Sequence, residues 1–582
     1  MANSRLRKLG SYLRPHWRMV LLGTIALLIV NLLGVYIPLL IKDSIDQLEG
    51  EFSFNQLSRT ALWLLLLSAI MWCFRMYSRT SIFGIGRQVE FGLKQRIFQH
   101  LLTIEPGYFS NNTSGDLINR ATSDVDNIRR LVGFALLSFI NIIFAYAFTL
   151  PVMLKINVRL TILAIAVYPL MLMTVQLFSG KLRRYQEEIQ VKLSDLSELI
   201  QEDMSGMALI RIYAQENQER AAFSQKNQQL LESNLKLAQV RNLLFPVIEG
   251  ISYISLLILL WVGTKAIADG QITVGDFIAL VLFVERLVFP TALLGFTITA
   301  YQQGEISIDR VESVTQAKPK IKNTAKAIIL PSTEIKGAIT ARNLTYTYPG
   351  SNTPALYDLN FEIQPGETVA IVGSIGSGKS TLANAIPRLL NIAEGELFLD
   401  NCDITKLDLE SLRKAIAYVP QDSFLFSTTI KNNIRYGEPL AETAEVIQSA
   451  QQAQIHPEIL TFPQEYDTLV GERGITLSGG QRQRTALARA LLADAKVLIL
   501  DDSLSSVDNE TATKILNSLS PTTAKKTVIF ISHQLSAAAT CDRILVMDQG
   551  KIVQNGTHAT LVQETGLYQS LWQQHRLKEV LN

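Results

Sequence analysis

The sequence has few cysteines and almost no net charge, and each scarcity excludes a class of protein. Its three cysteines, Cys73, Cys402 and Cys541, are scattered through 582 residues without CxxC spacing. This pattern supports neither a disulfide framework nor a zinc site. The formal net charge is +2, so the chain lacks the basic excess of a nucleic-acid-binding protein and we expect no nucleic-acid partner. Histidine is also scarce, and of the six only His533 enters the interpretation below.

Apolar residues, by contrast, are abundant. They make up 48% of the chain, and the mean hydropathy of +0.19 is too high for an ordinary soluble enzyme. Residues 19–41 form an apolar run of about twenty residues, enough to cross a bilayer as a helix. Further runs centre near Leu65, Ile142, Ile165, Ile258 and Leu282. We therefore predict an all-α membrane domain with six transmembrane helices.

The charges at the N-terminus predict the orientation of these spans. Residues 1–18 contain five Lys or Arg residues and no acidic residue. Basic flanks stay on the cytoplasmic side, so the N-terminus is expected in the cytoplasm, and an even number of spans places the C-terminus there too. We expect a multi-pass protein of the cell (inner) membrane.

Two long polar segments interrupt the apolar runs, one between spans 2 and 3 and one between spans 4 and 5. Residues 91–102 and 193–244 in these segments have helical periodicity, which predicts that the spans continue as helices beyond the membrane. Pro106 is expected to end the first of them, residues 114–120 to form a short crossing helix, and residues 205–214 to form a second turn. Either these are plain hairpins with surface turns, or the two turns are coupling helices that contact a second domain of the protein.

Four charged residues fall at or near the apolar runs, namely Arg75, Glu249, Glu285 and Arg286. Charges within spans usually face a cavity or a partner helix. Glu285 is the candidate for lining a pathway, whereas for Arg75 we favour a position at the membrane interface.

The composition changes after a linker at residues 313–335, which is rich in Lys, Thr, Ala and Pro. Strands, glycine turns and helices alternate from residue 336 onwards, as in an α/β nucleotide-binding domain. The fold class is therefore a membrane all-α six-helix domain (1–312) followed by an α/β P-loop nucleotide-binding domain (336–582).

A phosphate-binding loop anchors this second domain. A β-branched apolar run over residues 369–372 predicts a buried strand, and residues 373–380 fit the pattern GxxxxGK[S/T]. Glycines allow the backbone N–H groups to approach a phosphate chain, Lys379 would reach the β- and γ-phosphates, and the Ser380 hydroxyl would hold Mg²⁺. A Gly/Ser-rich turn is the alternative, but it does not explain the strand before it and the Lys-Ser pair. The expected ATP-binding residues are Gly373, Ser374, Ile375, Gly376, Ser377, Gly378, Lys379, Ser380 and Thr381.

Five further side chains are candidates for the same site. Tyr348 could stack on adenine or be a half-buried strand tyrosine, and Gln421 ends a strand with an amide that could meet Mg²⁺ or the attacking water. The apolar strand 497–500 leads to Asp501, placed to hold Mg²⁺, and to Asp502, the candidate to orient the attacking water. His533 follows another strand and is a candidate sensor of the γ-phosphate, although a lone histidine is more often structural.

A second anion-binding segment lies at Ser478, Gly479, Gly480 and Gln481, ahead of a predicted helix. One domain cannot easily bring both the phosphate loop and the segment 478–481 to a single γ-phosphate. A second copy is therefore expected to supply the opposing segment.

Together these motifs resemble an ATP-binding cassette (ABC) exporter half-transporter, and the resemblance covers nearly the whole chain. Leu-Ser-Gly-Gly-Gln at 477–481 is similar to the family signature, and the Thr-x-Val-Gly-Glu-Arg-Gly run at 468–474 is typical of exporters. The resemblance implies that Tyr348 stacks on adenine, Gln421 is the Q-loop residue, Asp508 the D-loop aspartate and His533 the switch histidine. It also implies that two chains clamp two ATP molecules and that closure turns the helix bundle from inward- to outward-facing.

One position departs from the family pattern. The family usually carries a catalytic glutamate after the strand aspartate, and this chain has Asp502. The intact segment 478–481 could still complete a good site on a partner. We favour the degenerate half of a heterodimer whose partner carries the glutamate, with a homodimer as the alternative.

The resulting interpretation is an ATP-hydrolysing translocase that exports amphipathic drugs or lipids by alternating access, as in multidrug efflux. An ATP-gated channel on the same frame is the alternative, although the sequence offers no extra regulatory domain to support it. A soluble P-loop ATPase is excluded by the six apolar runs.

Overall fold

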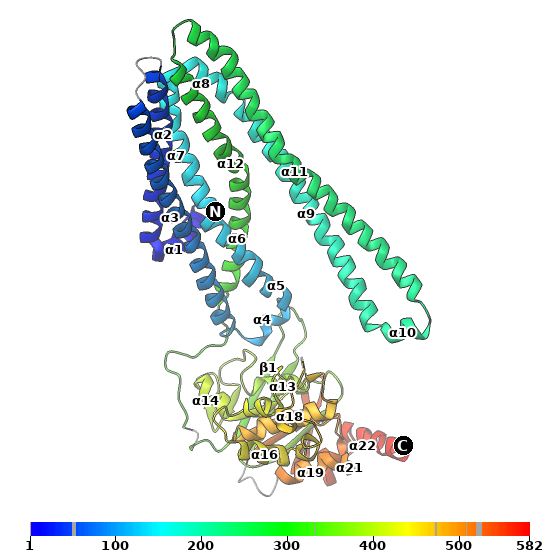
Figure 1. The fold of residues 1–582 in the computed structure, drawn as a ribbon. Helices are drawn as coiled ribbons and strands as arrows, with labels where there is room; N and C mark the ends of the chain where they lie inside the picture. The colour runs from blue at the N-terminus through cyan, green and yellow to red at the C-terminus, as the bar shows by residue number, and fades with distance from the viewer. Residues whose placement is uncertain are drawn as a thin grey trace. The chain divides into compact units, whose positions relative to one another are not determined.

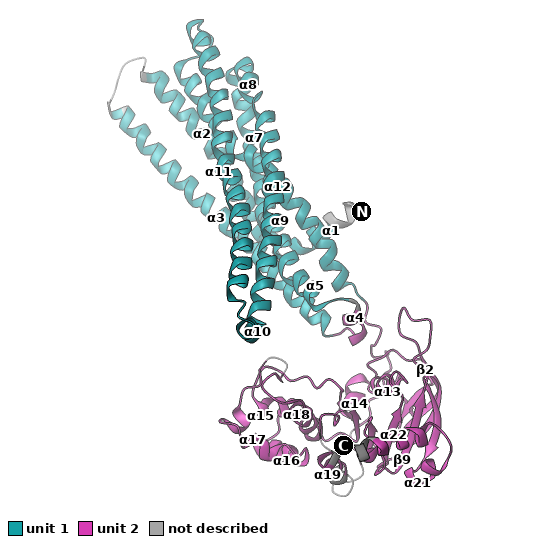
Figure 2. Cartoon of the chain, turned by 90° about the vertical axis from the view of Figure 1, so that its right-hand side faces the viewer, with its two compact units in different colours: residues 1–102, 112–317 teal, residues 103–111, 318–582 magenta. Residues whose placement is uncertain are grey.

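A computed structural model describes residues 2–48, 54–331, 333–471, 474–507, 509–519 and 526–581. The chain divides into two compact units (Figures 1 and 2). Unit 1 comprises residues 1–102 and 112–317, and unit 2 comprises residues 103–111 and 318–582. The predicted linker is partly ordered on unit 2, because Ile328 forms a β-bridge with Leu407.

Unit 1 is entirely helical. Its main elements are α1 (Ala2–Leu13), α2 (Trp17–Leu48), α3 (Phe54–Leu101), α5 (Ser114–Asn119), α6 (Val125–Arg130), α7 (Leu136–Ile156), α8 (Val158–Ile165), α9 (Tyr168–Ser205), α10 (Met207–Ile212), α11 (Glu216–Ala268) and α12 (Val274–Thr315). Within the described residues, six helical stretches are long and apolar enough to cross a membrane. They contain the six apolar runs, so the predicted six-helix domain is confirmed.

The helices continue beyond the apolar runs, as the polar periodicity predicts. α3 extends to Leu101, α9 extends to Ser205, and α11 begins at Glu216. The turn predicted at 205–214 contains the short helix α10, which begins after Gly206 and is followed by Ala214 at φ +49°.

The prediction for residues 114–120 is wrong. This segment is not a separate crossing helix, because α5 runs on through η2 (Arg120–Asp124), α6 and η3 (Leu131–Ala135) into α7. Nor does Pro106 end the preceding helix, which already stops at Leu101. Pro106 instead opens a separate short helix, α4 (Pro106–Asn111), that belongs to unit 2. Proline is tolerated at the first position of a helix because its missing N–H would have no partner there.

α9 and α11 form a long hairpin with α10 at its tip, and in Figure 1 this hairpin diverges from α12 towards α10. Polar contacts join its two arms. Ser233 Oγ donates to Glu188 Oε1 at 2.9 Å, and Lys192 Nζ donates to Gln229 Oε1 at 3.0 Å.

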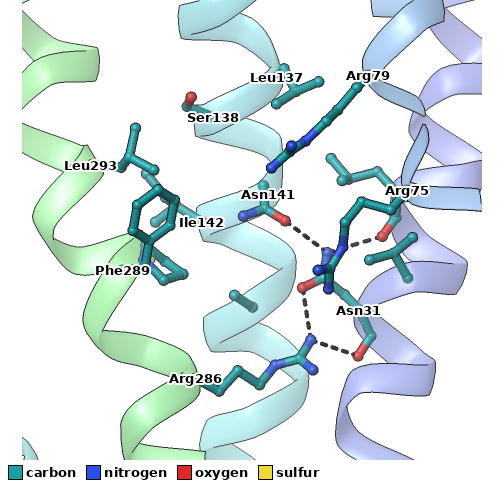
Figure 3. A pocket seen from close by; sticks show the side chains of 14 residues that line it. Asn31, Arg75, Arg79, Leu137, Ser138, Asn141, Ile142, Arg286, Phe289 and Leu293 are labelled. Carbon is teal, nitrogen blue, oxygen red and sulfur yellow. Dashed lines mark hydrogen bonds between the residues drawn. The ribbon is translucent and has the colours of Figure 1, made fainter. Parts of the chain in front are cut away.

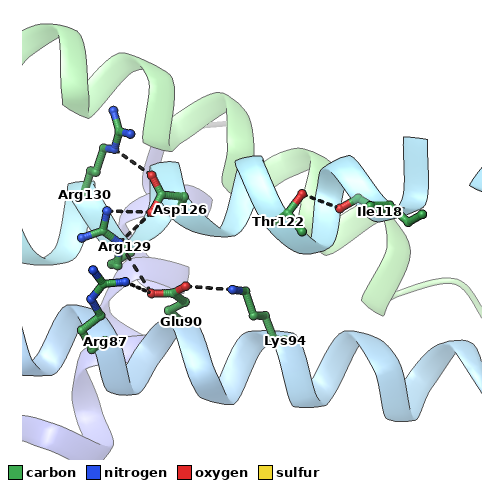
Figure 4. A network of polar contacts seen from close by, with 8 residues as sticks. All are labelled: Arg87, Glu90, Lys94, Ile118, Thr122, Asp126, Arg129 and Arg130. Carbon is green, nitrogen blue, oxygen red and sulfur yellow. Dashed lines mark hydrogen bonds and ion pairs between the residues drawn. The ribbon is translucent and has the colours of Figure 1, made fainter. Parts of the chain in front are cut away.

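A charge network joins α3 to α6 (Figure 4). Glu90 of α3 pairs with Arg87 at 2.9 Å and Lys94 at 2.8 Å on its own helix, and lies 3.6 Å from Arg129 of α6. Arg129 also pairs with Asp126 at 2.6 Å. Glu90 and Arg129 are partly buried, whereas Arg87 and Lys94 are exposed. Ion pairs that remain open to solvent contribute only about 0–1 kcal/mol each, so the network orients the two helices more than it stabilises the fold.

Unit 2 contains two sheets. One is antiparallel, in the order β2-β1-β4-β5, and the other has the order β10-β9-β3-β8-β7-β6 with parallel pairing from β9 to β6. The strands are β1 (Ile339–Tyr346), β2 (Leu356–Ile363), β3 (Thr368–Gly373), β4 (Leu397–Leu399), β5 (Cys402–Asp403), β6 (Ile416–Val419), β7 (Val497–Asp501), β8 (Thr527–Ile531), β9 (Arg543–Asp548) and β10 (Lys551–Gly556).

Helices cover the strands of unit 2. They are α13 (Lys379–Ala385), α14 (Leu409–Lys414), α15 (Ile430–Arg435), α16 (Thr443–Gln452), α17 (His456–Ile459), α18 (Gly479–Leu492), α19 (Asn509–Leu519), α20 (Leu535–Ala538), α21 (His558–Gln563) and α22 (Leu567–Leu581).

The six-stranded sheet is buried on both faces, which explains its continuous apolar strands. Along β3, Val369 and Ile371 face one core, whereas Ala370 and Val372 face the other. β7 and β8 alternate between the same two cores. Because β3, β6, β7 and β8 run parallel, their carboxyl ends lie at one edge of the sheet. The α/β fold predicted for the second half is confirmed.

Candidate functional site

A cleft of about 340 Å³ opens at the carboxyl edge of the parallel strands. Ligands of open α/β sheets bind at this edge. The structure brings most of the predicted ATP-site residues together here. The cleft is lined by Tyr348, Ala355, Ile375, Gly376, Ser377, Gly378, Lys379, Ser380, Thr381, Gln421, Asp501, Asp502, Ile531 and His533.

The phosphate loop between β3 and α13 has the conformation that its sequence predicts. Gly378 has φ +97°, and a Cβ there would collide with the carbonyl oxygen of Ala355, so only glycine fits. This close approach brings the loop backbone against the segment that contains Ala355.

Lys379 is buried and folds back onto its own loop. Its Nζ donates to Gly373 O at 3.0 Å, Ser374 O at 2.7 Å and Ser377 Oγ at 3.3 Å. Burial lowers the pKa of Lys379, while Asp502 and Asp501 act in the opposite direction. Within the described part of the chain this ammonium has no ion-pair partner, so a polyphosphate would supply the anion that the site lacks.

The two predicted metal ligands on the loop and on β7 are in contact. Ser380 Oγ donates to Asp501 Oδ1 at 3.0 Å, and Tyr418 donates its hydroxyl hydrogen to Asp501 Oδ2 at 3.1 Å. No group of three or more His, Cys, Asp or Glu side chains that could hold a metal occurs among the described residues. One carboxylate and one hydroxyl nevertheless fit Mg²⁺, which usually binds one or two protein oxygens together with substrate phosphates and water.

Burial raises the pKa of Asp501, while Ser380 and Tyr418 partly offset the effect. Because the folded-state pKa lies above the unfolded value, the folded protein holds this proton more tightly. Protonation of Asp501 therefore stabilises the folded protein at low pH, and this stabilisation is lost as the pH rises through the folded-state pKa of Asp501. At neutral pH the buried, charged carboxylate therefore destabilises the nucleotide-free protein.

Asp501→Asn is accordingly expected to raise the melting temperature of the nucleotide-free protein by a few degrees at pH 7. The difference from the unmodified protein should shrink as the pH falls through the raised folded-state pKa, because the carboxyl then takes up its proton. The same variant should lose the further thermal shift produced by ATP with Mg²⁺. Thermal unfolding across pH tests this, with Asp494→Asn, an exposed aspartate of the same unit, as the control. A lower melting temperature at pH 7 would contradict the argument.

Asp502 follows directly after β7 in an unusual backbone conformation, with φ +47°. Aspartate is one of the few non-glycine residues that tolerate this region. Asp502 Oδ2 accepts from Gln421 Nε2 at 3.5 Å, and Asp502 Oδ1 is buried without a hydrogen-bond donor among the described residues. Asp502 thus carries an acceptor atom that no described donor satisfies. The exposed His533 lines the same cleft from the end of β8.

Tyr348 lies at the side of the cleft with 41% of its surface exposed. Its hydroxyl is 3.2 Å from Thr381 Oγ1, and its ring packs edge-on against Tyr346 at 5.1 Å between centroids. A half-exposed ring held at both ends is suited to stacking with a base.

The segment Ser478–Gln481 is intact and separate from this cleft. Ser478 caps α18, because its Oγ accepts from Gln481 N at 3.2 Å and its backbone N donates to Gln481 Oε1 at 2.9 Å. None of these four residues lines the cleft at the phosphate loop. Among the described residues, Gln421 is shared between that cleft and a second one that contains Gly479.

Some site residues were not predicted from the sequence, and one prediction cannot be evaluated. Tyr418 and Asp548 were missed, the latter accepting from Ser374 Oγ at 2.6 Å. Gln483 was also missed, although it links α18 to the segment after β7 by donating to Ser505 Oγ at 3.0 Å. No local pattern distinguishes these residues from ordinary ones. Asp508 lies outside the described residues.

Comparison with known proteins was made on sequence and on structure. Residues 20–291 match the family described as "ABC transporter transmembrane region", and residues 356–505 match "ABC transporter". The chain is 31% identical over 576 residues to the probable multidrug resistance ABC transporter ATP-binding/permease protein YheI of Bacillus subtilis (strain 168), covering 99% of this chain and 98% of that protein.

Two further similarities also extend over almost the full length. The chain is 32% identical over 569 residues to the ATP-dependent lipid A-core flippase of Syntrophus aciditrophicus (strain SB), covering 98% and 94% of the two chains. It is also similar to a bacterial Atm1-family ABC exporter solved with ATP bound, with a TM-score of 0.78 and 25% identity over 96% of this chain and 99% of that one.

Proposed function

Because this chain belongs to the ABC transporter family and carries both its transmembrane region and its ATP-binding domain, we propose that it is one half of an ATP-driven exporter of amphipathic small molecules or lipids. The membrane domain occupies residues 1–312, the linker 313–335 and the nucleotide-binding domain 336–582. Two relatives named for multidrug resistance and for lipid A-core flipping support this substrate class. Both termini lie in the cytoplasm, and the six spans cross the cell membrane.

The cleft at the phosphate loop holds ATP in this proposal. The backbone of 373–381 cradles the phosphates, Lys379 neutralises them, and Tyr348 stacks on the base. Ser380, Asp501 and Gln421 would hold Mg²⁺, which neutralises charge on the phosphate oxygens when bound. Asp502 accepts a hydrogen bond from the attacking water, and His533 donates to the γ-phosphate from the end of β8.

One observation favours a site shared between two chains. The cleft contains the phosphate loop but none of Ser478, Gly479, Gly480 and Gln481, which form a second anion-binding device at the start of α18. A partner chain would bring its own 478–481 segment to this cleft. By resemblance to the family, Asp508, which follows Val507 in the sequence, would also contribute to the site shared between the two chains.

The choice of partner depends on Asp502. A side chain one methylene shorter than glutamate retracts the carboxylate by about 1.5 Å, and a 1 Å misplacement can reduce a rate on the order of 10²-fold. A heterodimer with a glutamate-bearing partner uses the intact 478–481 segment of this chain at the efficient site. A homodimer in which Asp502 still acts is the alternative.

Exposed apolar side chains at the tip of the α9–α11 hairpin support a further contact. Met204, Leu209, Ile212 and Tyr213 are 60–73% exposed around α10. Apolar clusters outside the membrane-spanning runs mark protein-interaction sites. We propose that α10 and α4 are the coupling helices that pass closure of the nucleotide site to the membrane helices.

A complementation experiment tests whether two chains share the site. Lys379→Ala and Ser478→Arg, each made in an Asp502→Glu background, should both be inactive as ATPases. In a mixed dimer, one cleft combines an intact Lys379 with an intact Ser478. A one-to-one mixture assembled together should therefore recover about a quarter of the parent activity, because half the dimers are mixed and each has one good site. An inactive mixture would reject a site shared between chains, because a site built within one chain would carry one of the two defects in every copy.

Export itself is tested in sealed vesicles with outward-facing nucleotide domains. ATP with Mg²⁺ should drive accumulation of an amphipathic dye or a labelled lipid by the Asp502→Glu protein or by the complex with its partner. The Lys379→Ala variant is the control. A nucleotide-gated ion current without dye or lipid accumulation would favour the channel alternative instead.

A further inference from the structure

A cavity in unit 1 lies between four of the long helices and is unusually rich in arginine (Figure 3). Arg75 and Arg79 reach it from α3, and Arg286 reaches it from α12. α2 and α7 form the remaining walls, and the cavity volume is about 220 Å³. Each of these helices includes a run that is long and apolar enough to cross a membrane.

Arg286 is held in a fixed position on α2. Its Nη2 donates to both Asn31 O and Asn31 Oδ1, each at 3.1 Å, and Asn31 Nδ2 donates to Asn141 Oδ1 of α7 at 3.1 Å. The guanidinium crosses α2 at Gly34, where any Cβ would overlap it. Gly34 thus leaves room for the Arg286 guanidinium, and Asn31 binds it through two hydrogen bonds.

The three guanidinium groups have no counterion within the described part of the chain. None of them forms an ion pair with a described carboxylate, and no acidic residue lines the cavity. Arg286 Nε is buried without a hydrogen-bond partner among those residues. Among the described residues, Arg75 makes one hydrogen bond, a long contact with Met71 Sδ at 3.8 Å. Arg286 is partly buried, whereas Arg75 and Arg79 are exposed and line the same cavity. Three cations that gather at one point of an apolar helix bundle without a counterion favour the binding of an anion.

The sequence prediction for this region changes accordingly. Glu285, the candidate for lining a pathway, is exposed and does not line this cavity, so its role stays a prediction. Arg75, for which an interfacial position was favoured, lines the cavity together with Arg286. A structural role alone would account for the contacts of Arg286 with Asn31, but not for two more arginines that face the same space.

The size and the walls of the cavity indicate the kind of anion. A volume of about 220 Å³ is below the usual range for a drug-sized ligand, and it suits a headgroup. Leu27, Leu293 and Phe289 form apolar wall beside the arginines, and Phe289 is 59% exposed. Guanidinium groups bind oxyanions in bidentate fashion.

We propose that this cavity binds the oxyanion headgroup of an anionic amphiphile, with the apolar part of the molecule lying along Leu27, Phe289 and Leu293. The identification of this amphiphile as transported substrate rests on the proposed export function, whereas the binding itself does not. The exporter would accordingly select anionic over cationic or zwitterionic amphiphiles.

Equilibrium binding to the full-length protein in phosphatidylcholine nanodiscs tests the proposal. The probe is dansyl-labelled dodecyl phosphate, and its zwitterionic counterpart is dansyl-labelled dodecylphosphocholine. We expect the dodecyl phosphate probe to bind more tightly, and Arg286→Gln or Arg75→Gln to weaken its binding about tenfold each, because each removes a charged hydrogen-bond donor. Arg286→Lys should retain part of the affinity.

Arg59→Gln is the matched control. Arg59 is an exposed arginine on α3, about 24 Å from Arg75 along the helix, and its loss should leave the affinity unchanged. Arg75→Gln leaves the Arg286–Asn31 contacts in place, so it remains informative if Arg286→Gln fails to fold.

Three outcomes would overturn the proposal. The two probes could bind with equal affinity, the arginine variants could bind dodecyl phosphate like the parent, or inorganic phosphate could displace the probe at the same concentration as unlabelled dodecyl phosphate. The last would indicate a site for a free anion. Because binding requires no ATP hydrolysis, loss of binding selectivity with intact ATP-driven export would refute only this inference. Intact binding without export would refute the proposed function.

Discussion

Asp502→Glu is expected to raise the ATPase turnover of the purified chain on the order of a hundredfold, from a slow basal rate. The carboxylate of Asp502 lies in the same cleft as Lys379 and His533, so the position is correct and only the reach is short. One added methylene advances the carboxylate by about one bond length, and displacements of this size can change a rate on the order of 10²-fold.

The immediate surroundings of Asp502 favour this outcome. Oδ1 has no donor among the described residues, and Gln421 Nε2 is 3.5 Å from Oδ2, a long contact that a longer side chain can replace without breaking a strong bond. A cost opposes it, because φ +47° suits aspartate better than glutamate. Backbone strain of this kind costs on the order of 1–3 kcal/mol of stability and should lower the melting temperature slightly, without cancelling the gain in rate.

Phosphate release by the detergent-solubilised or nanodisc-embedded dimer is the measurement. Asp494→Glu, a change of the same kind at an exposed position of unit 2, should leave the rate unchanged. Rapid turnover by the unmodified chain alone would reject the idea that its own site is degenerate. No increase in the glutamate variant would show that reach is not the defect.

Lys379→Ala is expected to weaken ATP binding by about 10²- to 5 × 10³-fold. The ammonium is buried and contacts only loop carbonyl oxygens and Ser377 Oγ, so a bound triphosphate would gain the single buried cation of the loop. Removing one partner of a buried charge pair typically costs about 3–5 kcal/mol, which corresponds to this change in affinity.

Binding of a fluorescent ATP analogue measures this effect independently of hydrolysis, which matters if the Asp502 site is slow. Lys414→Ala is the control, because Lys414 is 74% exposed and pairs with Glu410 on the surface of the same unit. In the Asp502→Glu background, Lys379→Ala should also return phosphate release to background. Unchanged affinity in Lys379→Ala would place ATP somewhere other than this cleft.

The two variants address different parts of one hypothesis. Lys379→Ala tests whether this cleft holds nucleotide, and Asp502→Glu tests whether it hydrolyses nucleotide poorly. A chain that binds ATP tightly but hydrolyses it slowly, with an intact 478–481 segment, fits the regulatory half of a heterodimer. A chain that hydrolyses well with Asp502 fits a homodimer.

Much of the architecture follows from short-range patterns. Apolar runs of about twenty residues predict six membrane helices, since a helix satisfies its own backbone hydrogen bonds within the segment. The phosphate loop is likewise local, because Gly378 adopts a backbone conformation, and makes a close approach, that only glycine allows. The match between these predictions and the six membrane-spanning stretches, β3 and α13 reflects constraints that act over a few neighbouring residues.

Local patterns fail where helix ends and side-chain directions depend on packing. Residues 114–120 have the composition of a short helix, but contacts with α12 draw them into a longer one. Thus Arg310 of α12 pairs with Asp116 at 3.0 Å, and Arg120 donates to Ser313 Oγ at 2.8 Å. Neither partner is near in sequence, so the boundary could not be predicted.

The sequence by itself therefore determined the two domains, the six spans and the nucleotide-binding loop, because hydrophobic run length and glycine geometry act within one segment. Only the tertiary structure decided which distant side chains meet. Ser380 and Asp501 are 121 residues apart, and Arg286 reaches Asn31 across 255 residues. The cationic cavity depends on how four helices are rotated about their axes, and that rotation is set by the packing of all of them together.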